Sequence, residues 1–305
     1  MAHTETRAAM TTQFFATAPL GMEGLLASEL RDLGIEEVIE KKAGVAFSGS
    51  LVDAYRACLW SRLANRVLMP LHQFPSATVD QLYEGVRAVD WPSHLEAGAA
   101  LAVDFSSSRS AIQHTLFGAQ KVKDAVVDEF RGQGFERPSV DRLNPDLRIN
   151  LYLDRDIASV SIDLSGDSLH RRGYRTEGGK APLKENLAAA ILLRATWPKI
   201  FREGGALIDP MCGSGTLPIE AALMAADRAP GLNRSWYGFM GWRGHQADVW
   251  FNLVNEARER FQKGLEHMPP IVGFDMDARA IQIAKANLER AGLQGAVLFE
   301  RRSVE

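Results

Sequence analysis

The chain has 305 residues, of which 46% are hydrophobic and 24% charged, and its formal net charge is −3. These values are typical of a globular protein with two or three domains, and no run of about 18 apolar residues predicts a transmembrane helix. Residues 1–10 lack the layout of a secretory signal, and the two cysteines and seven histidines have no metal-ligand spacing. We therefore expect a cytoplasmic protein without a membrane segment or a bound metal.

The first part of the chain predicts a small α+β subdomain over residues 12–65, preceded by a flexible tail at 1–11. Its expected elements are a strand at 13–16, a helix at 21–33, a strand pair at 37–41 and 44–47, and a helix at 51–64. In the first helix Leu25, Leu26 and Leu30 recur at core spacing, and Gly34 marks its end.

A second domain is expected over residues 66–165. Its predicted strands are 66–74, 100–105, 149–153 and 157–164, and its predicted helices are 79–89 and 116–131. The last two strands form a hairpin around Asp154, Arg155 and Asp156. Both strands alternate apolar and polar residues, which predicts that one face of the sheet is solvated or used for binding.

Residues 166–184 are rich in glycine and charge, which predicts a basic linker before the last domain at 185–305. In that domain the helices expected at 185–195, 217–226 and 278–291 alternate with strands at 206–208, 271–274 and 296–299. This alternation predicts a parallel, doubly wound sheet. An insertion of about residues 227–268 separates the first two strands. We expect its aromatic residues to be core residues rather than base-stacking ones; they are Trp236, Tyr237, Phe239, Trp242 and Trp250.

Two motifs of this domain predict a nucleoside site. Residues 209–216, Asp-Pro-Met-Cys-Gly-Ser-Gly-Thr, join the first strand to a helix, and the glycines let the backbone approach a ligand closely. Asp275 follows the second strand, where a carboxylate can accept both ribose hydroxyls. Taken singly, Gly-Ser-Gly is a plain turn and Asp275 or Asp277 a helix cap. Together, in this order and at the ends of predicted strands, the motifs favour a binding site, although 66 positions separate Asp209 from Asp275.

These motifs resemble those of class I S-adenosylmethionine-dependent RNA methyltransferases that carry a THUMP domain. The segments 117–125, 169–187 and 225–232 are similar to the same family, and the similarity covers about residues 12–300. The resemblance implies a ferredoxin-like and THUMP front followed by a Rossmann-like methyltransferase domain. It also implies S-adenosylmethionine as cofactor, and methylation of guanine N2 in 23S ribosomal RNA. The implied cofactor-binding residues are Asp209, Met211, Gly213, Gly215, Asp275 and Met276, with Asp275 on the ribose and Met276 against the adenine.

The catalytic segment that the resemblance implies, an Asn-Pro-Pro-Tyr type of motif, does not occur in these residues. Pro269–Pro270 is the one Pro-Pro pair and stands before the second strand. Ser303 stands where the family has an acid that reads the adenine amine. We therefore expect a fragment of a longer protein, with a truncated methyltransferase domain and no catalytic residue of its own, that is active only as part of the parent chain. The strand at 206–208 would then have an uncovered edge.

Two basic segments are predicted to bind RNA by shape, as THUMP-like modules would. In the linker the candidates are Arg171, Arg172, Arg175 and Lys180, interleaved with His170 and Tyr174. Around the start of the helix at 116–131 they are Arg109, Lys121 and Lys123. Without the resemblance, a solvated linker would explain the first segment equally well, and a solvated helical face would explain the second slightly better than RNA binding. The expected partner is 23S ribosomal RNA or its precursor, and the oligomeric state is not predicted.

Three other functions compete with this hypothesis. A non-catalytic RNA-binding module with a retained cofactor fold is favoured by the missing Asn-Pro-Pro-Tyr segment, and finding that segment in a longer reading frame would exclude it. A methyltransferase for DNA or a small amine is disfavoured by the THUMP-like front. A nicotinamide-dependent enzyme is disfavoured because the loop lacks the Gly-x-Gly-x-x-Gly pattern.

Overall fold

The computed structural model describes residues 11–175 and 183–303, which fall into two compact units. Of the described residues, the first unit contains 11–16, 66–167 and 236–247, and the second contains 17–65, 168–175, 183–235 and 248–303. This division differs from the predicted boundaries in two places. Residues 17–65 belong with the C-terminal part of the chain, and a short piece of the predicted insertion belongs with the second predicted domain.

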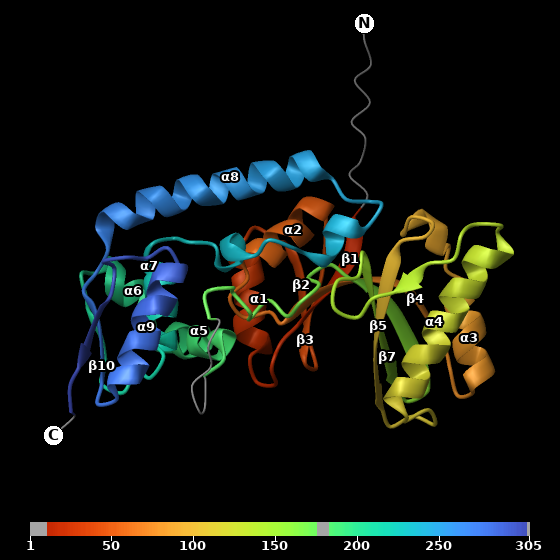
Figure 1. The fold of residues 1–305 in the computed structure, drawn as a ribbon, viewed down its shortest axis with the longest axis horizontal. Helices are drawn as coiled ribbons and strands as arrows, with labels where there is room; N and C mark the ends of the chain where they lie inside the picture. The colour runs from red at the N-terminus through yellow and green to blue at the C-terminus, as the bar shows by residue number, and fades with distance from the viewer. Residues whose placement is uncertain (1–10, 176–182, 304–305) are drawn as a thin grey trace, which may run out of the picture. The chain divides into compact units, whose positions relative to one another are not determined.

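The first unit is built on a mixed sheet with strand order β1-β4-β8-β7-β5-β6. β8 pairs antiparallel with β4 on one side and with β7 on the other, whereas β5 runs parallel to both β7 and β6. The strands are β1 (Thr12–Thr17), β4 (Arg66–Pro75), β5 (Ala100–Ser108), β6 (Ser139–Val140), β7 (Leu147–Asp154) and β8 (Ile157–Asp163). The helices are α3 (Val79–Arg87), α4 (Thr115–Gly132) and the 3₁₀ helix η1 (Trp91–Ser93). Figure 1 shows α3 and α4 side by side next to β5 and β7.

The β7–β8 hairpin confirms the predicted turn but corrects the predicted open face. Arg155 and Asp156 have φ values of 51° and 58°, as a two-residue turn between right-twisted strands requires. β7 alternates between buried and more exposed residues, but β8 is buried on both faces from Val160 to Asp163. One reason is that Asp163 forms an ion pair with Arg66 from the neighbouring β4.

The second reason is that residues 236–247 pack over the end of β8. The Phe239 amide donates to the Leu164 carbonyl at 3.1 Å, within the 3₁₀ helix η3 (Gly238–Gly241). A Cβ on Gly238 would lie 2.2 Å from the Asp163 carbonyl oxygen, so this close approach requires glycine. Of the five insertion aromatics predicted as core, Tyr237 and Phe239 are buried, and Trp242 and Trp250 are half-buried. The prediction is wrong for Trp236, which is 45% exposed.

The second unit begins with a helix–hairpin–helix piece, α1 (Glu23–Asp32), β2 (Glu37–Lys41), β3 (Gly44–Gly49) and α2 (Leu51–Trp60). β2 and β3 are antiparallel, and a capping box of Ser50 and Asp53 starts α2. α2 ends four residues earlier than predicted. Its end is fixed by the Glu29 carboxylate, which accepts hydrogen bonds from the Ser61 hydroxyl at 2.6 Å and the Arg62 amide at 2.8 Å.

The rest of this unit contains a three-stranded parallel sheet of order β11-β10-β9, which confirms the Rossmann-like prediction. Its strands are β9 (Leu207–Asp209), β10 (Ile271–Asp275) and β11 (Leu298–Arg301). Its helices are α5 (Glu185–Arg194), α6 (Trp197–Arg202), α7 (Thr216–Ala225), α8 (Ala247–Gly264) and α9 (Ala278–Arg290), with 3₁₀ helices η2 (Pro230–Asn233) and η4 (Leu265–His267). Figure 1 shows α7 and α9 next to β10. Within the described ranges β9 pairs with β10 alone, and Ile208 is 65% exposed.

Across residues 11–175 and 183–303, the structure contains no helix long and apolar enough to cross a membrane.

Candidate cofactor site

The glycine loop and Asp275 meet at the carboxyl end of the parallel sheet. β9 and β10 are adjacent, with Asp209 in register with Gly273, so the loops that follow the two strands lie side by side. The Cys212 amide donates to the Phe274 carbonyl at 2.8 Å, and the Gly213 amide donates to Asp275 Oδ2 at 3.0 Å. The two motifs, which are 66 positions apart in the sequence, are therefore in direct contact.

The Asp275 carboxylate is held in a fixed orientation by backbone donors. Its Oδ2 accepts from Gly213, and its Oδ1 accepts from the Asp277 amide at 2.9 Å. Each carboxylate oxygen has a second lone pair, which leaves acceptor capacity for hydroxyl groups of a ligand. Asp277 has a different role, because its side chain accepts from the Arg279 amide at 2.8 Å and caps α9.

The two loop glycines have different surroundings. Gly215, with φ +80°, packs so closely that a Cβ would lie 2.7 Å from the Phe299 ring and 3.0 Å from the Ala284 Cβ. Gly213, with φ +54°, would have no heavy atom within 4 Å of an added Cβ. Gly215 is therefore required for packing of the loop on α9 and β11, whereas Gly213 faces the open side that a ligand can occupy.

Two carboxylates make this end of the sheet electronegative. Burial raises the pKa of Asp209, the negative charge of Asp275 raises it further, and a 3.1 Å hydrogen bond from the Met211 amide works in the opposite direction. Burial, followed by the charges of Asp209 and Asp275, raises the pKa of the Cys212 thiol to about 12. The thiol is therefore protonated at neutral pH, and the site suits a ligand with a positive charge.

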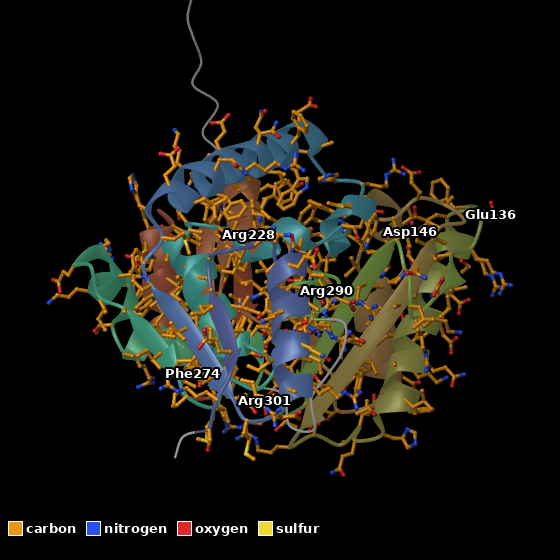
Figure 2. The ribbon with its side chains drawn as sticks, turned by 60° about the vertical axis from the view of Figure 1, so that its left-hand side comes forward. Glu136, Asp146, Arg228, Phe274, Arg290 and Arg301 are labelled. Carbon is orange, nitrogen blue, oxygen red and sulfur yellow. The ribbon has the colours of Figure 1, made fainter. Side chains whose placement is uncertain are left out.

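The loop after β10 is joined to the end of β11. Met276 is 74% exposed, and its carbonyl accepts from Arg301 Nε at 3.0 Å. The Arg302 amide donates to the Asp275 carbonyl at 3.0 Å, while its guanidinium lies 5.2 Å from the centre of the Phe274 ring. Figure 2 labels Phe274 and Arg301 near the same end of β10 and β11. Met211, the other predicted thioether, is 76% exposed.

One residue of the site was missed by the sequence reasoning. Asn287 on α9 is fully buried, and its Nδ2 donates to the Ser214 carbonyl at 2.9 Å. The signal was present, because Asn287 lies on the same helical face as the buried residues Ile281, Ala284 and Leu288. A buried amide on such a face needs a polar partner.

The linker arginines do not form one basic surface. Arg171 is exposed, but Arg172 is 2% exposed, pairs with the buried Glu220 at 3.6 Å and donates to the Leu169 carbonyl at 2.7 Å. The predicted RNA contact by Arg172 is wrong for this reason, since its guanidinium is enclosed in the protein. Arg175 is half-buried and donates to the Leu183 carbonyl at 2.7 Å. Lys180 lies outside the described residues.

The interleaved ring residues of the linker also face inward. Tyr174 is buried and donates to Glu220 Oε1 at 3.0 Å, and burial raises the pKa of the phenol well above its usual value. It therefore cannot stack on a base. Burial, together with the nearby cations Lys184 and Arg172, lowers the pKa of His170 to about 4, so the imidazole is neutral at physiological pH.

The second basic segment lies in the first unit and is accessible. Arg109 forms a two-pronged contact with Asp154, at 2.7 and 2.9 Å, and its side chain is 50% exposed. On α4, Lys121 lies 5.7 Å from the centre of the Phe117 ring, and Lys123 forms an ion pair with Asp124. Lys123 also lines a cavity of about 270 Å³ together with Arg131, Arg137, Asp124, Asp128 and the start of β6. Arg131 and Arg137 were not among the predicted residues.

Three family descriptions match consecutive parts of the chain. An RlmL ferredoxin-like domain matches residues 13–68, a THUMP domain matches 76–163, and an RMKL-like methyltransferase domain matches 172–305.

Curated relatives are similar over almost the whole chain. The ribosomal RNA large subunit methyltransferase K/L of Methylococcus capsulatus is 60% identical over 293 residues, which cover 96% of this chain and 40% of the relative. The protein of the same name from Syntrophotalea carbinolica is 58% identical, with 96% and 41% covered. The chain thus spans about two fifths of the length of these relatives.

Two solved structures are similar in fold to almost the whole chain. A protein from Listeria monocytogenes, described as a predicted N6-adenine-specific DNA methylase, has a TM-score of 0.84 and 33% identity, covering 96% of this chain and 75% of that one. SMU.472, whose structure contains SAH, has the same TM-score and identity, with 96% and 76% covered. The chain therefore belongs to the family of methyltransferases that combine a ferredoxin-like domain, a THUMP domain and an RMKL-like methyltransferase domain.

Proposed function

We propose that these residues are the RNA-binding and S-adenosylmethionine-binding parts of an enzyme that methylates guanine N2 in 23S ribosomal RNA. The observation that carries the cofactor assignment is the contact of Gly213 with Asp275, which joins the glycine loop to an acid on the adjacent strand. The K/L relatives and the SAH complex of SMU.472 support the same assignment. The ribosomal substrate rests on the names of relatives that are about two and a half times as long as this chain.

The residues of the site fit the parts of this cofactor. Asp275 would accept the ribose hydroxyls, since backbone donors already orient its carboxylate. Asp209 would face the positively charged methionine part, with Gly213 leaving room for it and Gly215 holding the loop against Phe299 and Ala284. The exposed thioethers of Met276 and Met211 are available to cover the flat adenine and the open side of the pocket. The bound cofactor would supply the methyl group on a sulfonium centre.

The RNA would be held by the accessible cations. These are Arg171 in the linker, Arg109 beside β7, Lys121 and Lys123 on α4, and Arg131 and Arg137 around the cavity. Such cations contact phosphates without reading sequence, in keeping with recognition of RNA by shape. Arg175 would contribute little, because its guanidinium is engaged by Leu183 and by Glu185 at 3.3 Å.

Methylation of guanine N2 needs groups that these residues do not supply. The lone pair of the exocyclic amine is delocalised into the ring, so acceptors must bind its hydrogens and direct the lone pair at the methyl group. The one Pro-Pro pair, Pro269–Pro270, lies at the opposite end of β10 from Asp275. We infer that the acceptors come from another part of the protein. A non-catalytic RNA-binding module is the second candidate, favoured by this same position of Pro269–Pro270.

The first test is a calorimetric titration of S-adenosylmethionine into the full chain and its Asp275→Ala variant. Loss of two charge-assisted hydrogen bonds is expected to weaken binding at least ten-fold. Asp32→Ala, at an exposed position on α1, is the matched control and should bind like the wild type. Absence of binding by the wild type would refute the cofactor assignment. Transfer of a labelled methyl group to 23S RNA, followed by identification of the modified base, tests the substrate and separates the enzyme from the binding module.

RNA binding is tested separately, by titration of a 23S RNA fragment at several salt concentrations. Lys123→Ala and Arg137→Ala should each weaken binding and lower the salt slope by about one. Lys199→Ala, at an exposed position on α6, should leave both unchanged. Equal effects of all three variants would contradict the assignment of this surface.

A further inference from the structure

The glycine loop is held from behind by one side chain, that of Asn287. Its Nδ2 donates at 2.9 Å to the carbonyl of Ser214, which stands between Gly213 and Gly215. The Asn287 side chain is fully buried, whereas Ser214 is half-buried. Glycines at positive φ hold a conformation weakly by themselves, because many backbone states are open to them. An external hydrogen bond to the residue between them therefore has a direct influence on the shape of the loop.

Arg290, one helical turn further along α9, fixes the orientation of the Asn287 amide. Its Nη2 donates to Asn287 Oδ1 at 2.7 Å, so the amide nitrogen must point toward Ser214. The Nε of Arg290 donates in addition to the carbonyl of Tyr174 in the linker, at 2.8 Å. Figure 2 labels Arg290 on α9. One guanidinium thus connects the linker to the residue that holds the loop.

The linker is attached to the other side of the loop as well. The Tyr174 hydroxyl donates at 3.0 Å to Glu220, on the helix α7 that starts directly after Gly215. Arg172, two residues earlier, pairs with the same carboxylate. The main chain and the side chain of Tyr174 are therefore bound to α9 and α7, the two helices that flank the glycine loop.

We propose that Asn287 is a positioning residue for the cofactor loop, and that Arg290 couples the loop to linker residues 168–175. The proposal rests on the proposed function, because it assumes that this loop binds S-adenosylmethionine. Asn287 shapes the loop before the ligand arrives, which reduces the ordering cost of binding. A displacement of the linker at Tyr174 would release Arg290 and, through it, loosen the hold on Ser214, so the state of the linker and the affinity for the cofactor are linked.

The decisive variant is Asn287→Asp, which keeps the acceptor for Arg290 but replaces the donor that Ser214 needs. Loss of one net hydrogen bond corresponds to a dissociation constant for S-adenosylmethionine that is about three- to ten-fold higher. Asn252→Asp makes the same chemical change at an exposed position on α8 and should leave the constant unchanged. Hydrogen exchange of the loop amides at 213–215 in the ligand-free chain should become faster in Asn287→Asp, whereas the affinity for the 23S RNA fragment should stay the same.

A double-mutant cycle tests the coupling. Arg290→Lys keeps the positive charge but cannot hold Asn287 and Tyr174 together, and it should weaken cofactor binding about two- to three-fold. Combined with Asn287→Asp, its effect should be smaller than the product of the two single effects, because both act through one contact. If Asn287→Asp fails to fold, the effect of Arg290→Lys on cofactor binding still tests the proposal.

The outcomes separate this proposal from the proposed function. If the wild type does not bind the cofactor, the proposed function fails. If the wild type and Asn252→Asp bind, Asp275→Ala does not, and Asn287→Asp and Arg290→Lys bind like the wild type, the positioning role is overturned while the site remains. Fully multiplicative effects in the double variant would overturn the coupling.

Discussion

The two glycines of the cofactor loop offer a test in which one chemical change has two different consequences. Gly213→Ala and Gly215→Ala both place a Cβ on a backbone at positive φ, which costs about 1–2 kcal/mol, partly offset by a stiffer unfolded chain. At Gly215 the new methyl group would also lie 2.7 Å from Phe299 and 3.0 Å from Ala284. Both neighbours are buried, so overpacking adds about 1–3 kcal/mol.

We therefore expect Gly215→Ala to lower the free energy of unfolding by about 2–4 kcal/mol, and Gly213→Ala by about 1 kcal/mol. Relative to the stability that each variant loses, Gly213→Ala should weaken cofactor binding more than Gly215→Ala. The reason is that the Gly213 methyl group would occupy the open side of the loop beside Asp275. Urea denaturation without ligand measures the first quantity, and calorimetric titration at a temperature where both variants are folded measures the second. Equal destabilisation by the two variants would refute the reasoning.

Three further results are expected. Arg172→Ala leaves the Glu220 charge without its ionic partner in the interior and should cost about 3–5 kcal/mol of stability, whereas Arg171→Ala on the surface should leave the urea midpoint unchanged. The pKa of Asp209 is raised in the free protein, and a cationic ligand would lower it. Affinity for S-adenosylmethionine should therefore fall as the pH drops through the pKa of free Asp209 and stay level above it, and Asp209→Asn should remove this dependence in calorimetric titrations at several pH values. Cys212, with a thiol pKa of about 12, should resist iodoacetamide at pH 8 in the folded chain and react after unfolding, as followed by mass spectrometry.

The main elements of the site were predictable because they depend on local patterns. Alternating strands and helices predict a parallel sheet, and parallel strands bring Asp209 and Asp275 to one edge whatever the length of chain between them. The hydrogen bond from Gly213 to Asp275 depends on the register of β9 and β10, which the motifs do not specify. The sequence alone could therefore not predict this hydrogen bond.

The linker shows where local patterns fail. Its composition is that of a solvated segment, yet Arg172 and Tyr174 are buried because α7 presents Glu220 to both of them. The only trace in the sequence is that Glu220 is a single acid within the apolar run 216–225, which requires a buried partner. Nothing in the run indicates that the partner lies 48 residues earlier. Asn287 was missed for the same reason, since its partner is a backbone carbonyl.

The short piece of the insertion that packs on β8 affects how this protein can be recombined in evolution. The first unit is assembled from separate stretches of chain, and residues 236–247 reach it only after the glycine loop and α7 have been made. Gly238 and Phe239 are fitted to the main chain around Asp163 and Leu164. A gene fusion that joined residues 66–167 to a different transferase would leave that backbone uncovered. A fusion that keeps residues 236–247 together with 66–167 is therefore expected to be more stable than one that omits them.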